Sequence, residues 1–69
     1  MPTVTLNGSE QALPDGAVVA DAVVASGAPT DGRGVAVAVD GEVVPRAQWA
    51  TRELGAGGQV EVLHAVQGG

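Results

Sequence analysis

Apolar side chains alternate with polar or small ones in three stretches of the chain, residues 3–6, 35–39 and 59–65. A repeat of two residues is typical of a strand with one buried face and one face toward solvent. The sequence therefore predicts three strands that share one core. The side chains expected to face that core are Val4, Leu6, Val35, Val37, Val39, Val60 and Val62.

Tight turns are expected directly after the first two of these strands. Asn7-Gly8 and Asp40-Gly41 have the composition of two-residue hairpin turns, because both positions of such a turn need a left-handed backbone. Each turn should lead into a short return strand. We expect these return strands over residues 11–13, whose leucine turns inward, and over residues 42–44.

One helix is expected between the two hairpins. In residues 19–26, apolar or small side chains recur at the spacing of one helical face. Gly27 suits the left-handed residue that ends a helix, and Pro29 prevents its continuation. Val18 is a poor N-cap, and eight residues are too few for a helix that is stable alone. The helix must therefore be held by packing on the sheet.

A second, shorter helical element is expected after the second hairpin. Pro45 has no N–H to donate, so it ends the return strand and favours an edge position for that strand. Residues 46–50 are then predicted to form one tight helical turn. Trp49 lies in this turn and is the single aromatic residue of the chain. We expect its ring to fill one end of the core.

The order of elements is hairpin, helix, hairpin, helical turn and strand, which predicts an α+β fold. A helix that crosses a small mixed sheet of about five strands is the β-grasp layout. We expect the first strand at the centre of the sheet with the last strand beside it. Residues 1–66 would form this domain, and residues 67–69 a flexible tail that leaves it from a rigid base.

Size and composition exclude several classes of function. A chain of 69 residues has room for one thin core and none for a deep substrate cleft, so a self-contained enzyme is not expected. The net charge of −5 and the absence of lysine argue against nucleic-acid binding. There is no cysteine, no signal peptide and no apolar stretch long enough to cross a membrane, so we expect a cytoplasmic, monomeric protein.

The C-terminal residues Gln67, Gly68 and Gly69 are the candidate reactive site. Two glycines have no side chains, so they can lie in a slot too narrow for a Cβ atom. The remaining functional group is the carboxylate of Gly69, which can attack the α-phosphate of a nucleotide if a partner enzyme supplies the nucleotide and the metal. The product would be an acyl-adenylate. The alternative is a frayed chain end without function.

Several motifs resemble one known family, and together they extend over nearly the whole chain. They are Leu13-Pro14-x-Gly16, Val44-Pro45-Arg46-x-Gln48-Trp49-Ala50 and Gly68-Gly69. With these motifs the chain resembles the sulfur-carrier proteins of thiamine thiazole synthesis, the ubiquitin-like ThiS family. The proline-arginine-tryptophan motif about twenty residues before a terminal Gly-Gly is the most specific feature.

The resemblance implies a function in which the protein is a substrate rather than an enzyme. An adenylating, E1-like activating enzyme would use ATP and Mg²⁺ to adenylate the carboxylate of Gly69, and sulfur would replace AMP to give a thiocarboxylate. Thiazole synthase would take that sulfur for thiamine. Gly68 matches the slender approach to this end, whereas Gln67 departs from the alanine common in the family and adds bulk there.

Two further departures concern stability rather than chemistry. Val18 stands where the family often has a hydroxyl residue at the N-cap, and Gly57-Gly58 where an acidic residue is usual.

A docking surface for both partners is expected on the solvent face of the sheet. Its residues would be Ala36, Ala38, Leu63 and Ala65. Such an apolar patch is typical of an interaction site. The alternative is that these are scattered small residues without consequence.

The remaining chemistry-bearing residues favour no other site. His64 has no second histidine or cysteine with which to bind a metal, and the carboxylates lack ligand spacing. We therefore expect no metal site and no bound cofactor. Arg46 is expected to pair with a carboxylate on the surface, with a partner role as the alternative.

Three other functions stay open from the sequence. The first is a sulfur carrier for molybdopterin, cysteine or tRNA thiolation, which shares the Gly-Gly end. The second is a ubiquitin-like modifier joined through Gly69 to lysines of target proteins. The third is a binding module with an inert tail.

Overall fold

The computed structural model describes residues 2–29 and 31–64. Ala65, Gln67, Gly68 and Gly69, which the sequence places in the candidate site, lie outside the described residues. The elements are β1 (Thr3–Leu6), β2 (Ser9–Ala12), α1 (Val19–Ser26), β3 (Val35–Val39), β4 (Glu42–Val43), the 3-10 turn η1 (Arg46–Gln48) and β5 (Gln59–His64). Helix α1 occupies the predicted residues, and the predicted α+β class is confirmed.

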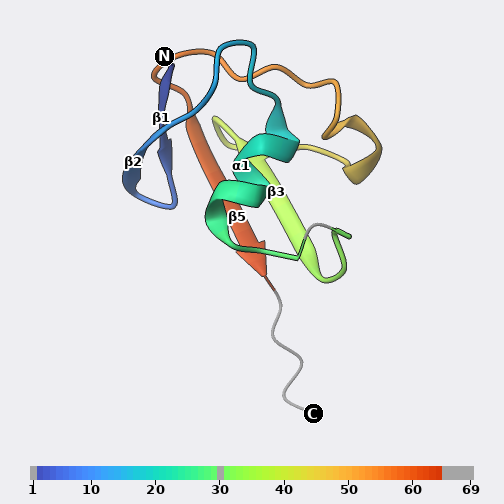
Figure 1. Ribbon diagram of the computed structural model, residues 1–69. Coiled ribbons are helices and arrows are strands. Elements are labelled where there is room, and N and C mark those ends of the chain that lie inside the picture. Colours follow the sequence, from blue (N-terminus) through green and yellow to red (C-terminus); the bar gives the residue numbers. More distant parts are fainter. Residues whose placement is uncertain (1, 30, 65–69) are drawn as a thin grey trace.

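The five strands form one mixed sheet in the order β2-β1-β5-β3-β4. Figure 1 labels β1, β2, β3 and β5 of this sheet. Strand β5 pairs parallel with β1 and antiparallel with β3, while β4 lies at an edge as predicted. The last strand lies beside the first, as predicted, and both are internal strands. The middle position of the five belongs to β5 rather than to β1, because one hairpin lies on each side of β5.

Both return strands have bounds that differ from the predicted ones: β2 begins and ends earlier, and β4 ends earlier. Asn7 and Gly8 both have positive φ, 50° and 83°, which makes the turn as tight as a two-residue hairpin allows. This turn sets Ser9 opposite Leu6, so β2 covers residues 9–12 rather than 11–13. Leu13 follows the strand and is buried, as expected. Strand β4 likewise ends one residue before the predicted boundary.

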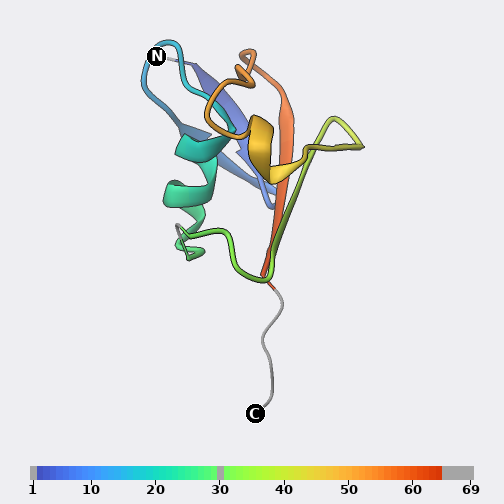
Figure 2. The ribbon, with the colours of Figure 1, turned by 90° about the vertical axis from the view of Figure 1, so that its right-hand side faces the viewer.

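A single apolar core lies between the sheet and α1. The helix lies to one side of the strands, as Figures 1 and 2 show from two directions. It buries Val19, Ala22 and Val23, which are three of the four residues on the predicted face. The rest of the core comes from the inward faces of the strands and from the loops. Those buried residues are Val4, Leu6, Leu13, Ala17, Val37, Val39, Val44, Trp49, Leu54, Val60 and Val62.

The start of α1 is capped by another part of the chain, which explains how Val18 can serve there. The backbone N–H groups of Val19 and Ala20 donate to the carbonyls of Arg52 (2.9 Å) and Trp49 (3.0 Å). The carboxylate of Asp21 accepts the N–H of Val18 at 2.8 Å. Donors at a helix start need partners, and here the segment after η1 supplies them. The departure at the N-cap is thereby compensated.

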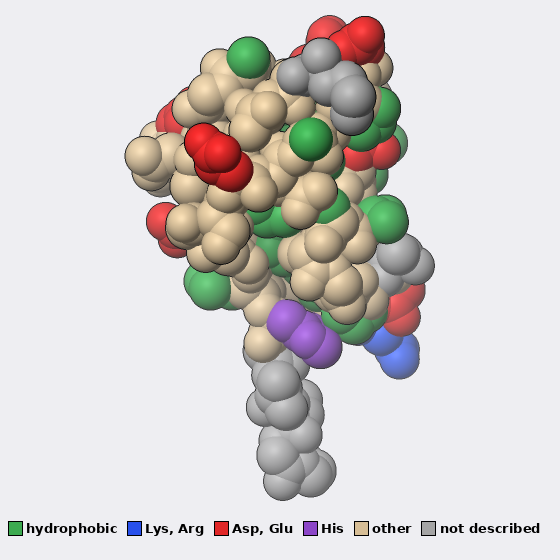
Figure 3. All heavy atoms as spheres, turned by 60° about the vertical axis from the view of Figure 1, so that its left-hand side comes forward, with side chains coloured by type: hydrophobic (Ala, Val, Ile, Leu, Met, Phe, Trp, Pro, Cys, Tyr) green, Lys and Arg blue, Asp and Glu red, His purple; other side chains and the backbone are tan. Residues whose placement is uncertain are grey.

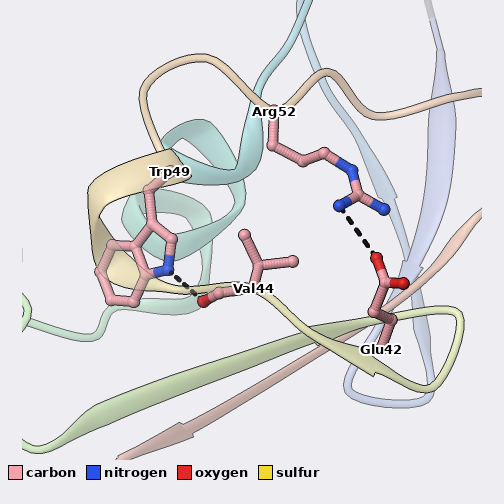
Figure 4. A network of polar contacts seen from close by, with 4 residues as sticks. All are labelled: Glu42, Val44, Trp49 and Arg52. Carbon is pink, nitrogen blue, oxygen red and sulfur yellow. Dashed lines mark hydrogen bonds and ion pairs between the residues drawn. The ribbon is translucent and has the colours of Figure 1, made fainter.

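Trp49 fills the end of the core, as predicted. Its side chain is buried, and its indole Nε1–H donates to the carbonyl of Val44 at 3.0 Å (Figure 4). Gly32 packs into the notch between this ring and Arg46, since a Cβ atom there would lie 2.7 Å from Arg46 Nε and 3.2 Å from the ring. The tryptophan thus joins the edge hairpin, η1 and the loop before β3.

Candidate functional site

Strand β5 leads to the candidate site, since the chain continues from its last residue into residues 65–69. Both neighbours hold it. On one side, β1 pairs with Gln59 and Val60; on the other, β3 pairs with residues 60–64, up to Val35 opposite His64. The last two residues of β5, which precede the predicted reactive tail, are therefore held by β3.

Asn7 adds a contact to β5 that the sequence did not predict. Its side-chain Oδ1 accepts the N–H of Val62 at 2.8 Å, and its Nδ2 donates to the carbonyl of Val62 at 3.2 Å. Sequence reasoning identified Asn7 only as a turn residue. The contact joins residues 55 positions apart, so nothing in the local pattern could indicate it.

The outer face of the sheet, opposite the helix, carries an apolar surface near the end of β5. Ala36 lies directly opposite Leu63, and Ala38 lies opposite both Val43 and Glu61. Leu63 is 64% exposed and Val43 is 71% exposed, which are high values for large apolar side chains. We call this surface the outer patch. It consists of Ala36, Ala38, Val43 and Leu63.

The outer patch contains three of the four residues that the sequence proposed for docking. Val43 is an addition that the sequence did not reveal, because a strand of two residues shows no alternation. Glu61 lies opposite Ala38, so a carboxylate borders the apolar outer patch.

The described residues form no pocket, and they include no group of three or more His, Asp or Glu side chains placed to bind a metal. His64 is exposed at the end of β5, and acidic side chains lie at separate places over the face shown in Figure 3. No described helix is long and apolar enough to cross a membrane.

The expectation of an ion pair for Arg46 was wrong. Among the residues that the structure describes, the ion pair joins Arg52 Nη1 to Glu42 Oε1 at 3.1 Å (Figure 4). Arg46 instead lies against Gly32 beside Trp49. The Arg52–Glu42 pair is substantially exposed, so its contribution to stability is small.

Comparison with known proteins agrees with this fold. The ThiS family profile matches residues 3–69. Among solved structures, the chain is similar to the thiamine biosynthesis protein ThiS from Geobacter metallireducens, with 25% sequence identity and a TM-score of 0.73. That match covers 97% of this chain and 99% of the other. No curated protein matched the chain in a sequence search. The ubiquitin-like β-grasp prediction is confirmed.

Proposed function

The chain belongs to the ThiS family of ubiquitin-like sulfur carriers, and on this basis we propose that Gly69 is its sulfur-bearing residue. In this proposal the carboxylate of Gly69 is adenylated, converted to a thiocarboxylate, and used as the sulfur source for the thiazole ring of thiamine. The observation that carries the proposal is that the family match extends through the terminal Gly68-Gly69.

The proposed reaction has two steps, and a partner enzyme catalyses both. A carboxylate oxygen of Gly69 attacks the α-phosphorus of ATP, and pyrophosphate leaves with Mg²⁺ balancing its charge. A hydrosulfide-equivalent nucleophile then attacks the acyl carbon, and AMP leaves. The product is the thiocarboxylate. The carrier contributes a reactive end and a surface by which it is recognised.

In this proposal the role of the carrier is therefore to bind its partner enzymes and to present the carboxylate of Gly69 to them. Two terminal glycines allow a narrow approach to the active site of each partner. The outer patch would be the docking surface for the activating enzyme and for thiazole synthase, since its large apolar side chains remain exposed in the free protein. Leu63 lies only six positions before Gly69, so docking there brings the reactive end close to the partner.

Leu63→Asp should weaken binding to the activating enzyme without unfolding the domain. Because Leu63 is exposed, the substitution should lower the stability of the free protein only slightly. In the complex, the new carboxylate would be buried against an apolar partner surface, which should raise Kd about ten-fold or more. Binding can be measured by calorimetry, with thermal unfolding to verify that the variant is folded.

Val24→Asp is the matched control for this experiment. Val24 lies on α1 and is 62% exposed, nearly the same as Leu63, but it is on the opposite layer. We expect its Kd to stay at the wild-type value. Equal affinities for wild type and Leu63→Asp would show that the outer patch is not the docking surface.

The recipient of the sulfur decides between this proposal and the alternatives. The thiocarboxylate form, incubated with thiazole synthase and its small-molecule substrates, should support thiazole formation, whereas the carboxylate form should not. Transfer to molybdopterin synthesis or tRNA thiolation instead would reassign the carrier to another branch. Accumulation of higher-mass conjugates in a cell extract would indicate a protein modifier.

A further inference from the structure

Both hairpin turns bind the central strand through side chains, and they do so at opposite ends of it. Asp40 Oδ1 accepts the N–H of Gln59, the first residue of β5, at 2.9 Å. Asn7 makes two hydrogen bonds to Val62, close to the last residue of β5. One contact therefore lies far from the C-terminus, and the other lies where β5 leads into residues 65–69.

Strand β1 ends at Leu6, and Asn7 forms the hydrogen bonds to β5 that a longer β1 would form. Its own N–H donates to the carbonyl of Val60 at 2.9 Å, as a further β1 residue would. Its φ of 50° then turns the chain away into the hairpin. From here the side-chain amide of Asn7, instead of the backbone, forms hydrogen bonds with the N–H and the carbonyl of Val62. The hydrogen bonding on this side of β5 thus continues from Val60 to Val62, two positions beyond the end of the backbone ladder.

Without this amide, β5 would be paired on only one side from residue 61 onward. Strand β3 would still hold Leu63 and His64 through Ala36 and Val35, but the other edge would be open. A strand end fixed on one edge can pivot more freely about that edge than one fixed on both. On the β1 side, the position of the last part of β5 therefore depends on Asn7.

We propose that Asn7 is a positioning residue for the reaction at Gly69. This inference rests on the proposed function of the C-terminus. Asn7 does not touch the reacting atoms; it acts through Val62 by fixing the last part of β5. The productive fraction of docked complexes is expected to depend on that geometry, because small displacements of reacting groups lower rates strongly.

Asparagine combines two properties that the position requires. It tolerates a left-handed backbone in a hairpin turn, and its amide has one acceptor and one donor end to match the two groups of Val62. Glycine would keep the turn and lose both bonds. Aspartate would keep the turn and the acceptor, but it would place a carboxylate oxygen against the Val62 carbonyl. Asn7→Gly is therefore the informative variant, with Asn7→Asp as a second one.

Asp40→Gly is the matched control. Asp40 has φ 49° at the same position of the second hairpin, and its side chain also binds β5. The substitution removes a side-chain bond to the same strand at the end remote from the C-terminus. It therefore reproduces the general loss of stability but leaves the contact with Val62 intact.

The experiment measures conversion of each variant by the activating enzyme, with the carrier as the varied substrate and at a temperature where all variants are folded. We expect Asn7→Gly to lower kcat about five-fold or more, with KM unchanged because the outer patch is intact. Asn7→Asp should show a loss of at least this size. Asp40→Gly should retain the wild-type kcat. Amide hydrogen exchange of the free protein should be faster at Val62 in Asn7→Gly only.

Three results would overturn the inference. Faster exchange at Val62 with unchanged kcat would show that the contact does not affect the reaction. An equal loss of kcat in Asp40→Gly would show a general effect of stability. Unchanged exchange at Val62 in Asn7→Gly would show that the amide does not fix β5. If wild type itself is not converted, the proposed function fails first, and the role of Asn7 in it fails with it.

Discussion

Trp49→Ala is expected to lower the free energy of unfolding by about 3–5 kcal/mol, the usual cost of removing a buried aromatic ring. The ring is buried, it is the only aromatic of the chain, and its N–H is bonded to Val44. A domain of 69 residues has a total stability of roughly 3–10 kcal/mol. The variant should therefore be largely unfolded, or close to it, at ordinary temperature.

The measurement is urea unfolding followed by far-ultraviolet circular dichroism, because the substitution removes the only tryptophan fluorophore. Trp49→Phe is the matched control. It keeps most of the ring volume but leaves the Val44 carbonyl without its indole donor, which should cost about 1–3 kcal/mol. A stability loss below 1 kcal/mol for Trp49→Ala would contradict the assignment of this ring as the plug of the core.

Gly68→Val should abolish most of the conversion of the C-terminus by the activating enzyme. In the proposed function, residues 68 and 69 lie in a narrow slot of the partner, and a β-branched side chain there would displace the carboxylate from the nucleotide. A displacement of this kind is expected to lower the rate roughly 100-fold. The stability of the domain should not change, because the core lies within residues 4–62.

Gln67→Ala is the comparison variant for this prediction. It removes bulk next to the reactive end and introduces the residue that is common in the family. Conversion should therefore equal or exceed that of wild type. If Gly68→Val were converted at the wild-type rate, the requirement for a slender terminus would be wrong, and the inert-tail alternative would gain support.

Local pattern was sufficient for the helix and for the three longer strands. Helix α1 begins and ends at the predicted residues because Gly27 and Pro29 mark its end and the apolar spacing marks its face. The return strand β2 was predicted to begin two residues and to end one residue too late. Its four residues are largely exposed and have no apolar alternation, so only the geometry of the turn decides its register.

The features that matter most for the candidate site are long-range and could not be predicted. The sequence predicted the last strand beside the first, as observed, but the bond from Asn7 to Val62 depends on the register between them, which no local pattern gives. The exposure of Val43 depends on the register of a two-residue strand. Capping of α1 by the carbonyls of Trp49 and Arg52 likewise follows from tertiary packing. By contrast, the terminal Gly68-Gly69 can be identified only from the sequence.

The structure and the proposed function are connected through the central position of β5. In the proposed function the partners supply the chemistry, and the carrier contributes recognition and the placing of its C-terminal end. Strand β5 lies between β1 and β3, its last two residues pair with β3, and the outer patch lies beside them.

The intact mass of the protein, after incubation with an activating enzyme, ATP-Mg²⁺ and a sulfur source, tests the central claim most directly. Wild type should be measured beside a variant that lacks Gly69. We predict exchange of one terminal oxygen for sulfur in wild type and no change in the variant. An unchanged mass of wild type, with an enzyme preparation that converts another carrier, would contradict the claim that Gly69 carries sulfur.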